Sequence, residues 1–236
     1  MYSKIKRIIN VSDNRKEGIL NMERYTKVKD IVEMTICILI AIIIALLVRH
    51  YVGTPTIVES VSMEPTLYAG QRLWVNRWGR TMGKLPSRGE IITFEAPSQI
   101  ISVNRENIDM SNPIAKYESK QKGLIENFVY NVLELGKTSY IKRVIALPGE
   151  HVKIEDGYVY INGEKLQEDY LPAGIVTDVE KGVYNDFVVP ENTVFAMGDN
   201  RPQSTDCRAF GCIPLEKIES TLAFRFWPLN EFGKVE

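Results

Sequence analysis

The chain has 236 residues, 44% of them hydrophobic, which is enough for one sizeable domain with its own core. Its formal net charge of −1 gives no electrostatic argument for a nucleic-acid partner. The near-zero total hides an uneven distribution, because residues 1–30 carry eight Lys or Arg residues against four acidic ones.

An apolar run follows this basic tail, from Ile31 to Val48, and is broken only by Glu33 and Thr35. Eighteen helical residues span roughly 27 Å, close to the ~30 Å hydrocarbon core of a bilayer. A buried core helix would show a polar stripe, and this run shows none. A cleaved signal peptide would end in a small-x-small site, but Arg49 follows the run instead. We therefore expect a transmembrane anchor at 31–50.

The basic flank predicts the orientation of this anchor. Positive residues are retained on the cytoplasmic side of membranes, so we expect residues 1–30 to be a cytoplasmic tail and residues 51–236 to lie outside the cell membrane. The chain would then cross the lipid bilayer once.

Short strands punctuated by Gly, Pro and Asn dominate the sequence after the anchor. Two dipeptides, Asp156-Gly157 and Asn162-Gly163, are typical of tight hairpin turns. The pattern predicts a mainly β fold, with an antiparallel, barrel-like domain over 51–236. The expected strands are Thr56–Val61, Arg72–Asn76, Glu90–Phe94, Tyr140–Ala146, His151–Glu155, Tyr158–Ile161, Thr193–Met197 and Thr221–Phe226.

Residues 97–139 do not fit this pattern. They are polar at first, and from Leu124 to Leu133 apolar residues recur at helical spacing. We expect an insertion made of a loop and an amphipathic helix. The helix would either pack on the β domain or lie on the membrane surface, and its scarcity of basic residues favours packing.

The exported part contains two cysteines, Cys207 and Cys212. Their spacing is not a metal signature, because no second Cys or His pair completes four ligands. An oxidising compartment would permit a disulfide between them. Two free thiols and one disulfide both remain open, with free thiols favoured.

Three stretches carry candidate chemistry. Ser62 stands in Ser-Met-Glu-Pro-Thr shortly after the anchor, and Lys142 stands in the apolar run Tyr-Ile-Lys-Arg-Val-Ile-Ala. A serine hydroxyl needs a base to become a nucleophile, and a lysine serves as that base only when burial keeps it neutral. The third stretch, Gly198–Gly211, is rich in turn residues, charges and hydroxyls and follows an apolar strand.

Taken in this order behind an anchor, the three stretches resemble the type I signal peptidases, the Ser-Lys endopeptidases that remove export signals. The stretches Arg88–Phe94 and Phe226–Leu229 are also similar to segments of that family. The resemblance covers most of residues 31–230.

The resemblance implies a role for individual residues. Ser62 would be the nucleophile and Lys142 the general base, with Ser204 orienting the lysine amine and Ser60 helping to form the oxyanion hole. The remaining positions of the family pattern would give structural support, and they are Arg143, Asp199, Asn200, Asp206 and Arg208.

One residue departs from the family pattern, because Cys207 stands where serine is usual. A Ser-His-Asp triad is the competing arrangement, but the chain has only His50, at the membrane edge, and His151, in a turn-like context. We expect no metal and no organic cofactor.

The resemblance implies that the partners are preproteins bearing a signal peptide that ends in an Ala-x-Ala type of sequence. Two alternatives stay open: a specialised peptidase for one exported substrate, such as a pilin subunit, and a non-catalytic membrane assembly factor of the same fold. A Ser-Lys self-cleaving regulator would need a DNA-binding domain, in place of which this chain has the anchor and a short basic tail. The oligomeric state does not follow from the sequence.

Overall fold

The computed structural model describes residues 2–98, 112–118, 123–131, 133–134, 136–177 and 183–235. The chain divides into two compact units, residues 1–47 and residues 48–236. We call the second one the β unit. Most of the predicted insertion's loop, residues 99–111 and 119–122, lies outside the described residues.

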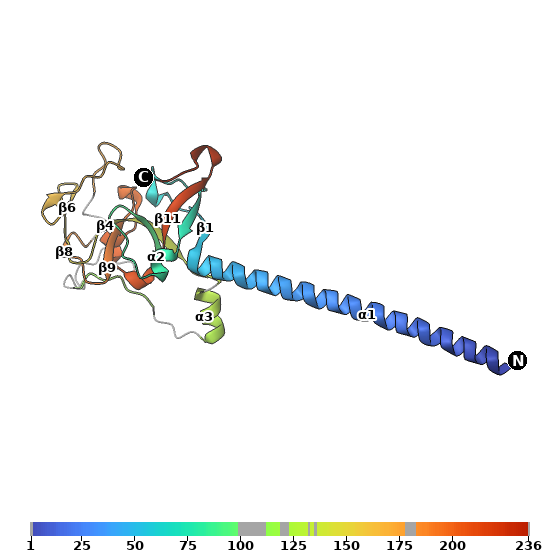
Figure 1. Cartoon of the computed structure of the whole chain (residues 1–236). Helices are drawn as coiled ribbons and strands as arrows, with labels where there is room; N and C mark the ends of the chain where they lie inside the picture. The colour runs from blue at the N-terminus through green and yellow to red at the C-terminus, as the bar shows by residue number, and fades with distance from the viewer. Residues whose placement is uncertain are drawn as a thin grey trace. The chain divides into compact units, whose positions relative to one another are not determined.

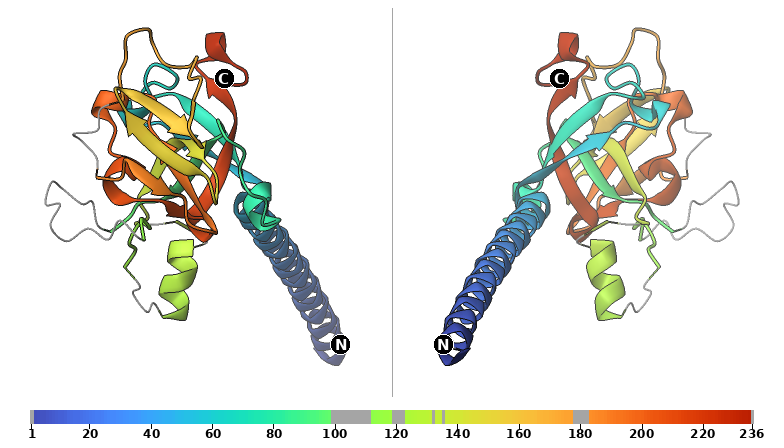
Figure 2. Two further views of the ribbon diagram at one scale, coloured as in Figure 1. Left: turned by 90° about the vertical axis from the view of Figure 1, so that its left-hand side faces the viewer. Right: turned by 90° about the vertical axis from the view of Figure 1, so that its right-hand side faces the viewer.

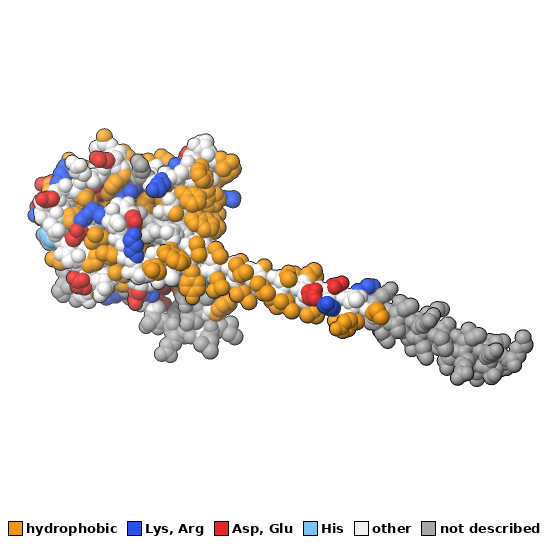
Figure 3. All heavy atoms as spheres, viewed as in Figure 1, with side chains coloured by type: hydrophobic (Ala, Val, Ile, Leu, Met, Phe, Trp, Pro, Cys, Tyr) orange, Lys and Arg blue, Asp and Glu red, His pale blue; other side chains and the backbone are white. Residues whose placement is uncertain are grey.

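The first unit is one helix, α1 (Tyr2–Leu47), which continues through the predicted tail without a break at residue 30. Charged side chains gather toward the N-terminal end of its described part, and hydrophobic side chains cover the rest (Figure 3). The stretch Arg24–Val52 is 29 residues long and apolar enough to cross a membrane, and none of its most apolar window is buried by protein. Its last residues form a π-helical turn, η1 (Val48–Val52), in the β unit.

The β unit contains a seven-stranded sheet and a four-stranded sheet (Figures 1 and 2). The larger sheet has the order β1 (Gly53–Ile57), β2 (Arg72–Asn76), β11 (Ile218–Trp227), β3 (Ile91–Glu95), β4 (Ser139–Ala146), β9 (Thr193–Met197) and β10 (Ile213–Pro214). The smaller sheet has the order β7 (Glu164–Lys165), β6 (Tyr158–Ile161), β5 (His151–Glu155) and β8 (Asp186–Val188). Neighbouring strands are antiparallel throughout.

The prediction of a mainly antiparallel β fold is confirmed. Within the described residues, however, the larger sheet ends at β1 and β10 without pairing between them, so these strands form open sheets and not a closed barrel. The two hairpin turns lie where the sequence places them: Asp156 and Gly157 both have positive φ, as do Asn162 and Gly163. Positive φ at both central residues suits the twist of a two-residue hairpin turn.

The short helices lie between the strands. They are α2 (Trp78–Thr81), α3 (Leu124–Asn131), α4 (Cys207–Phe210), and the 3₁₀ turns η2 (Val61–Met63), η4 (Arg201–Gln203), η5 (Leu215–Lys217) and η6 (Leu229–Glu231). Helix α3 forms where the apolar spacing predicts a helix.

Two hydrophobic cores stabilise the β unit. The larger core joins both sheets, with Phe94 and Val144 from one sheet and Val152 and Phe187 from the other. The smaller core lies under η2 and contains Val58, Met63, Leu67, Leu73, Val75 and Ile91. This smaller core holds the segment that carries Ser62.

Candidate active site

Ser62 is fixed by its neighbours on both sides of the turn η2. Met63 and Leu67 are fully buried in the smaller core, so the turn cannot rotate away from the sheet. The backbone N–H of Asn200 donates to the Ser62 carbonyl at 3.1 Å, and the Asn200 side-chain amide donates to the Val61 carbonyl at 3.0 Å. These contacts bring the loop after β9 against the serine segment.

Lys142 lies in the middle of the larger sheet. It is on β4, between β3 and β9, and only 3% of the residue is exposed. Its Nζ lies 2.5 Å from the Ser62 Oγ and donates to the Ile141 carbonyl at 2.9 Å. The fold thus brings together two residues that lie 80 positions apart in the sequence.

Burial sets the ionisation of this amine. Desolvation lowers the pKa of Lys142 to about 8, against the opposing influence of Asp206, Cys207 and Asp199. About one molecule in ten then carries a neutral amine at pH 7, and about half do at pH 8. A neutral amine accepts a proton from the Ser62 hydroxyl, which is what a general base requires.

Two further hydroxyls lie near the pair. The Ser60 Oγ is 3.1 Å from the Ser62 Oγ. The Ser204 Oγ is buried and makes no hydrogen bond of good geometry with any described residue, although its proximity helps to hold the pKa of Asp206 low. The structure therefore brings Ser204 to the site without a bond to Lys142.

Gly198 explains how the serine segment and Ser204 come so close. A Cβ at this position would overlap both the Ser204 Oγ and the Ser62 carbonyl oxygen, nearer than real Cβ contacts are found. Only glycine lets the end of β9 lie between these two groups.

Two buried ion pairs support the site. Arg143, next to Lys142 on β4, donates to both oxygens of Asp199, with the shortest contact at 2.8 Å. Arg208 binds both oxygens of Asp206 at 2.9 Å. Burial opposes ionisation of Asp206, but Arg208 and the Gly198 N–H hold the pKa of Asp206 below its usual value.

Asp199 also accepts a hydrogen bond from the Thr66 hydroxyl at 2.6 Å. The carboxylate therefore connects three segments: the lysine strand, the loop after β9 and the chain that follows the serine. Removing one partner of a buried ion pair leaves an uncompensated buried charge, so both Arg143 and Asp199 are needed at their positions.

Arg201 is a buried residue that the sequence reasoning missed. It is fully buried, and its guanidinium binds Glu168 at 2.5 Å and the Thr177 hydroxyl at 2.6 Å, while its Nε donates to the Gly198 carbonyl at 3.1 Å. The Tyr170 ring lies 4.1 Å from the Arg143 guanidinium. These contacts connect the loop after β9 to residues 168–177, which follow β7 in the sequence. The residues that make them are recognisable only by partners that are distant in the sequence.

A cavity of about 350 Å³ opens at the Ser62–Lys142 pair. Its lining includes residues 56–60 and residues 138–142. Both segments contain extended strand residues, so an extended peptide has the right shape to lie beside them.

Among the described residues, a histidine-based site is not assembled. His151 contacts Asp186 at 2.7 Å on the smaller sheet, and no serine in the described part of the chain is bonded to it. Cys207 and Cys212 are both free, buried thiols, and the Cys207 Sγ accepts a hydrogen bond from the Ala196 N–H at 3.2 Å. Among the described residues, no group of three or more His, Cys, Asp or Glu side chains is placed to hold a metal ion.

Comparison with known proteins agrees with this arrangement. Residues 31–227 match the family model described as signal peptidase, peptidase S26. The chain is 32% identical over 216 residues to a signal peptidase I of Bacillus licheniformis, covering 89% of this chain and 96% of that one. It is 33% identical over 205 residues to signal peptidase I T of Bacillus subtilis, covering 84% and 86%.

A solved structure, a signal peptidase I from Enterococcus faecalis, is 27% identical and covers 59% of this chain and 98% of that chain, with a TM-score of 0.38. From the family model and the curated relatives, the chain belongs to the signal peptidase family, peptidase S26. The resemblance to type I signal peptidases drawn from three sequence stretches is confirmed.

Proposed function

We propose that this chain is a membrane-anchored serine endopeptidase that removes N-terminal signal peptides from exported preproteins, with Ser62 as nucleophile and Lys142 as general base. The observation that carries the proposal is the buried contact of 2.5 Å between the Lys142 Nζ and the Ser62 Oγ. Family membership supports the reaction, and the lowered pKa of Lys142 supports the role of the amine.

The reaction has two halves. In the first, neutral Lys142 takes the proton of the Ser62 hydroxyl while the Ser62 Oγ bonds to the scissile carbonyl carbon. The C–N bond then breaks, and the Lys142 ammonium protonates the leaving amine, which leaves an ester on Ser62. In the second half Lys142 takes a proton from water while the water oxygen bonds to the ester carbon. The bond between that carbon and the Ser62 Oγ then breaks, the Lys142 ammonium returns its proton to Ser62, and the carboxylic acid product leaves.

The neighbouring hydroxyls have supporting roles in this proposal. The Ser60 hydroxyl and the Ser62 N–H stabilise the oxyanion of the tetrahedral intermediate, an interaction whose loss generally costs ~10²–10³ in rate. Ser204 orients the Lys142 amine once the amine turns toward it. Arg143, Asp199, Asn200, Asp206 and Arg208 are positioning residues, because they hold the segments that carry the pair.

The substrate is an extended peptide with small side chains before the scissile bond. The lining of the cavity includes residues 56–60 and residues 138–142, which contain parts of strands β1 and β4. Backbone pairing with such segments aligns an extended chain and leaves alternate side chains for the pockets. The small side chains of an Ala-x-Ala ending fit within a cavity of about 350 Å³.

The membrane anchor brings the enzyme to the surface where signal sequences emerge. The chain is a membrane-anchored protein by its apolar helix and its relatives. We infer further that it crosses the membrane once, with residues 1–30 in the cytoplasm and the β unit outside, because of the Lys and Arg excess before the span.

We also infer that residues 97–139 are an insertion that packs on the β unit. The Tyr130 hydroxyl donates to Glu95 at 3.0 Å, and Glu134, just after α3, binds Arg77 at 2.5 Å. These polar contacts hold the end of the insertion against the sheet and α2.

The test is cleavage of a signal-bearing preprotein in detergent or liposomes, with product N-termini read by mass spectrometry. The wild type should cleave after a small-x-small site, and both Ser62→Ala and Lys142→Met should lose cleavage by at least ~10³-fold. Ser87→Ala and Lys153→Met are matched controls, since neither residue lines the cavity, and Lys153 is a partly exposed strand lysine. A wild type inert on several preproteins would contradict general signal-peptide removal, and full activity in either variant would contradict the assigned pair.

A further inference from the structure

A group of arginines lies where the chain leaves the apolar span. Arg49 belongs to η1, and Arg77 and Arg80 lie at the start and within α2; we call these three residues the arginine cluster. The Arg77 N–H donates to the Val52 carbonyl at 3.0 Å, and an Arg77 guanidinium nitrogen donates to the Arg49 carbonyl at 3.3 Å. The cluster is therefore built into the first residues of the β unit.

The cluster carries more positive charge than its acidic partners balance. Glu134 is shared, since it accepts from Arg77 at 2.5 Å and from Arg49 at 3.3 Å. The nearby acid Glu219 is engaged by Lys137 at 2.5 Å. The three guanidinium groups and Lys137 thus share two carboxylates, Glu134 and Glu219, both of which act electrostatically on Arg80. Within the described part of the chain Arg80 makes no side-chain hydrogen bond or ion pair.

Several donors of the cluster are buried and unused. The Nε atoms of Arg49 and Arg77 have no hydrogen-bond partner among the described residues, and Arg77 is only 3% exposed. Burial and the charge of Arg77 both lower the pKa of Arg80, as expected where cations crowd together. Buried N–H donors are almost always paired in proteins, so this group of donors points to an anionic ligand.

The surroundings of the cluster match a membrane–water interface. η1 forms the last residues of the 29-residue span, so the chain itself places Arg49 at the edge of the bilayer. Tyr51 and Trp78 are 44% and 54% exposed, and Met82 is 67% exposed. Trp and Tyr prefer the headgroup level of membranes, where a polar edge and an apolar ring are both satisfied.

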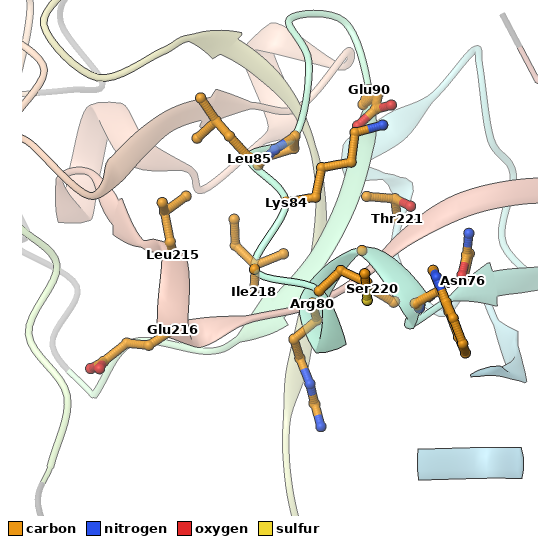
Figure 4. A pocket seen from close by; sticks show the side chains of 15 residues that line it. Asn76, Arg80, Lys84, Leu85, Glu90, Leu215, Glu216, Ile218, Ser220 and Thr221 are labelled. Atoms are coloured by element: carbon orange, nitrogen blue, oxygen red, sulfur yellow. Dashed lines mark hydrogen bonds between the residues drawn. The ribbon is translucent and has the colours of Figure 1, made fainter. Parts of the chain in front are cut away.

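A cavity of about 560 Å³ borders the same helix and is larger than the one at Ser62. Its lining includes Trp78, Arg80, Met82, Lys84 and Leu85 (Figure 4). Arg80 and Lys84 point away from each other in this view, with Lys84 directed toward the side where Glu90 lies. Arg80 therefore belongs to the arginine cluster, and Lys84 is a nearby cation outside it.

We propose that the arginine cluster binds the phosphate of an anionic phospholipid headgroup in the leaflet that surrounds the end of the span. Free phosphate would satisfy the same donors, but only a lipid also provides acyl chains for the exposed Trp78 and Met82 side chains. The proposal rests on membrane anchoring and not on the Ser62–Lys142 mechanism. Such a bound lipid would fix the β unit against the bilayer surface.

The test counts lipids bound to the full chain in a neutral detergent by native mass spectrometry, without substrate. Dioctanoyl-phosphatidylglycerol, dioctanoyl-phosphatidylcholine and inorganic phosphate are titrated separately. The wild type should bind phosphatidylglycerol more tightly than phosphatidylcholine. Arg80→Gln should weaken phosphatidylglycerol about fivefold, the usual effect of one basic residue at a membrane surface, while Lys84→Gln should stay near the wild type.

Arg49→Gln, at a partly exposed side chain, is the second variant if Arg80→Gln does not fold, as judged by its thermal midpoint. Equal weakening by Arg80→Gln and Lys84→Gln would overturn the proposal, since it would indicate attraction by net charge alone. Displacement of phosphatidylglycerol by an equal concentration of inorganic phosphate would also overturn it, in favour of a soluble anion site. Because no substrate is present, failure here is distinct from failure of the peptidase proposal.

Discussion

Lys142 carries an ionisable amine at a position where water hardly reaches. Its burial lowers the pKa of the amine to about 8, and the amine needs that shift to act as a base near neutral pH. The same shift is a cost to the folded state, because a charged amine is easier to keep in the solvated unfolded chain. Burial of Lys142 thus lowers the stability of the folded chain and favours the neutral, reactive form of the amine.

Lys142→Met should therefore stabilise the protein while it abolishes cleavage. The pKa falls from about 10.5 in the unfolded chain to about 8 in the folded one, which corresponds to roughly 3 kcal/mol at pH 7. Between these values the folded state binds fewer protons, so wild-type stability rises with pH. The advantage of Met should shrink from pH 8 to pH 10.5, as measured by urea unfolding of both full-length proteins in detergent. A methionine variant less stable at pH 7, or a gain independent of pH, would contradict this.

The sequence was enough to select candidates for the reactive residues but not all of the residues that hold them in place. Ser62 and Lys142 are recognisable from local composition and order. The partners of Arg201 are not, because Glu168 and Thr177 are 33 and 24 residues away and no local pattern marks a buried ion pair. The pairing of Arg143 with Asp199 likewise joins residues 56 positions apart, whereas Arg208 and Asp206 are close neighbours at the start of α4.

At the scale of elements, the site depends on the approach of two loops. The turn η2 brings Ser62, and the loop after β9 brings Ser204 and the two acidic residues of the ion pairs. Asn200 joins the loops by hydrogen bonds, and Gly198 lets them come into contact.

Gly198→Ala should damage this contact. Its Cβ would overlap the Ser62 carbonyl and the Ser204 hydroxyl, so one of the loops must move. Because a displacement of about 1 Å can cost ~10²-fold in rate, we expect kcat/KM for preprotein cleavage to fall by about that factor or more. Gly79→Ala is the matched control, since an added Cβ there meets no atom within 4 Å. Unchanged kcat/KM in Gly198→Ala would show that the close approach is not needed.

The elements themselves follow from sequence where they are long or have a clear turn. Strands β2, β5, β6 and β9 coincide with the predicted ranges. The first strand was misplaced: it runs from Gly53 to Ile57 instead of Thr56 to Val61. Pro55 lies within it, which is possible because β1 is an edge strand.

The short elements could not be predicted. β8 and β10 have three and two residues, and α2 has four, so none is long enough to show a periodic pattern. The open arrangement of the sheets is also beyond local pattern, because strand order is set by packing across the whole unit.

At the scale of the whole molecule, the anchor and the β unit have separate roles. The apolar span keeps the enzyme in the membrane in which its substrates are also held, so collisions occur in two dimensions and weak binding is sufficient. The β unit supplies a rigid sheet on which the lysine is buried, and the loops bring the serine to it. The central claim is that this lysine, in its neutral form, activates this serine.

The most direct test of that claim is the pH dependence of kcat/KM for preprotein cleavage by the full chain in detergent. We expect a rise with pH that levels off above an apparent pKa near 8. The chain has only two histidines, so the profile should be unchanged in a His50→Gln, His151→Gln double variant, and acetylating the α-amino group should not alter it. A profile that is flat between pH 6 and 9, or that loses its ionisation in the double variant, would contradict Lys142 as the base.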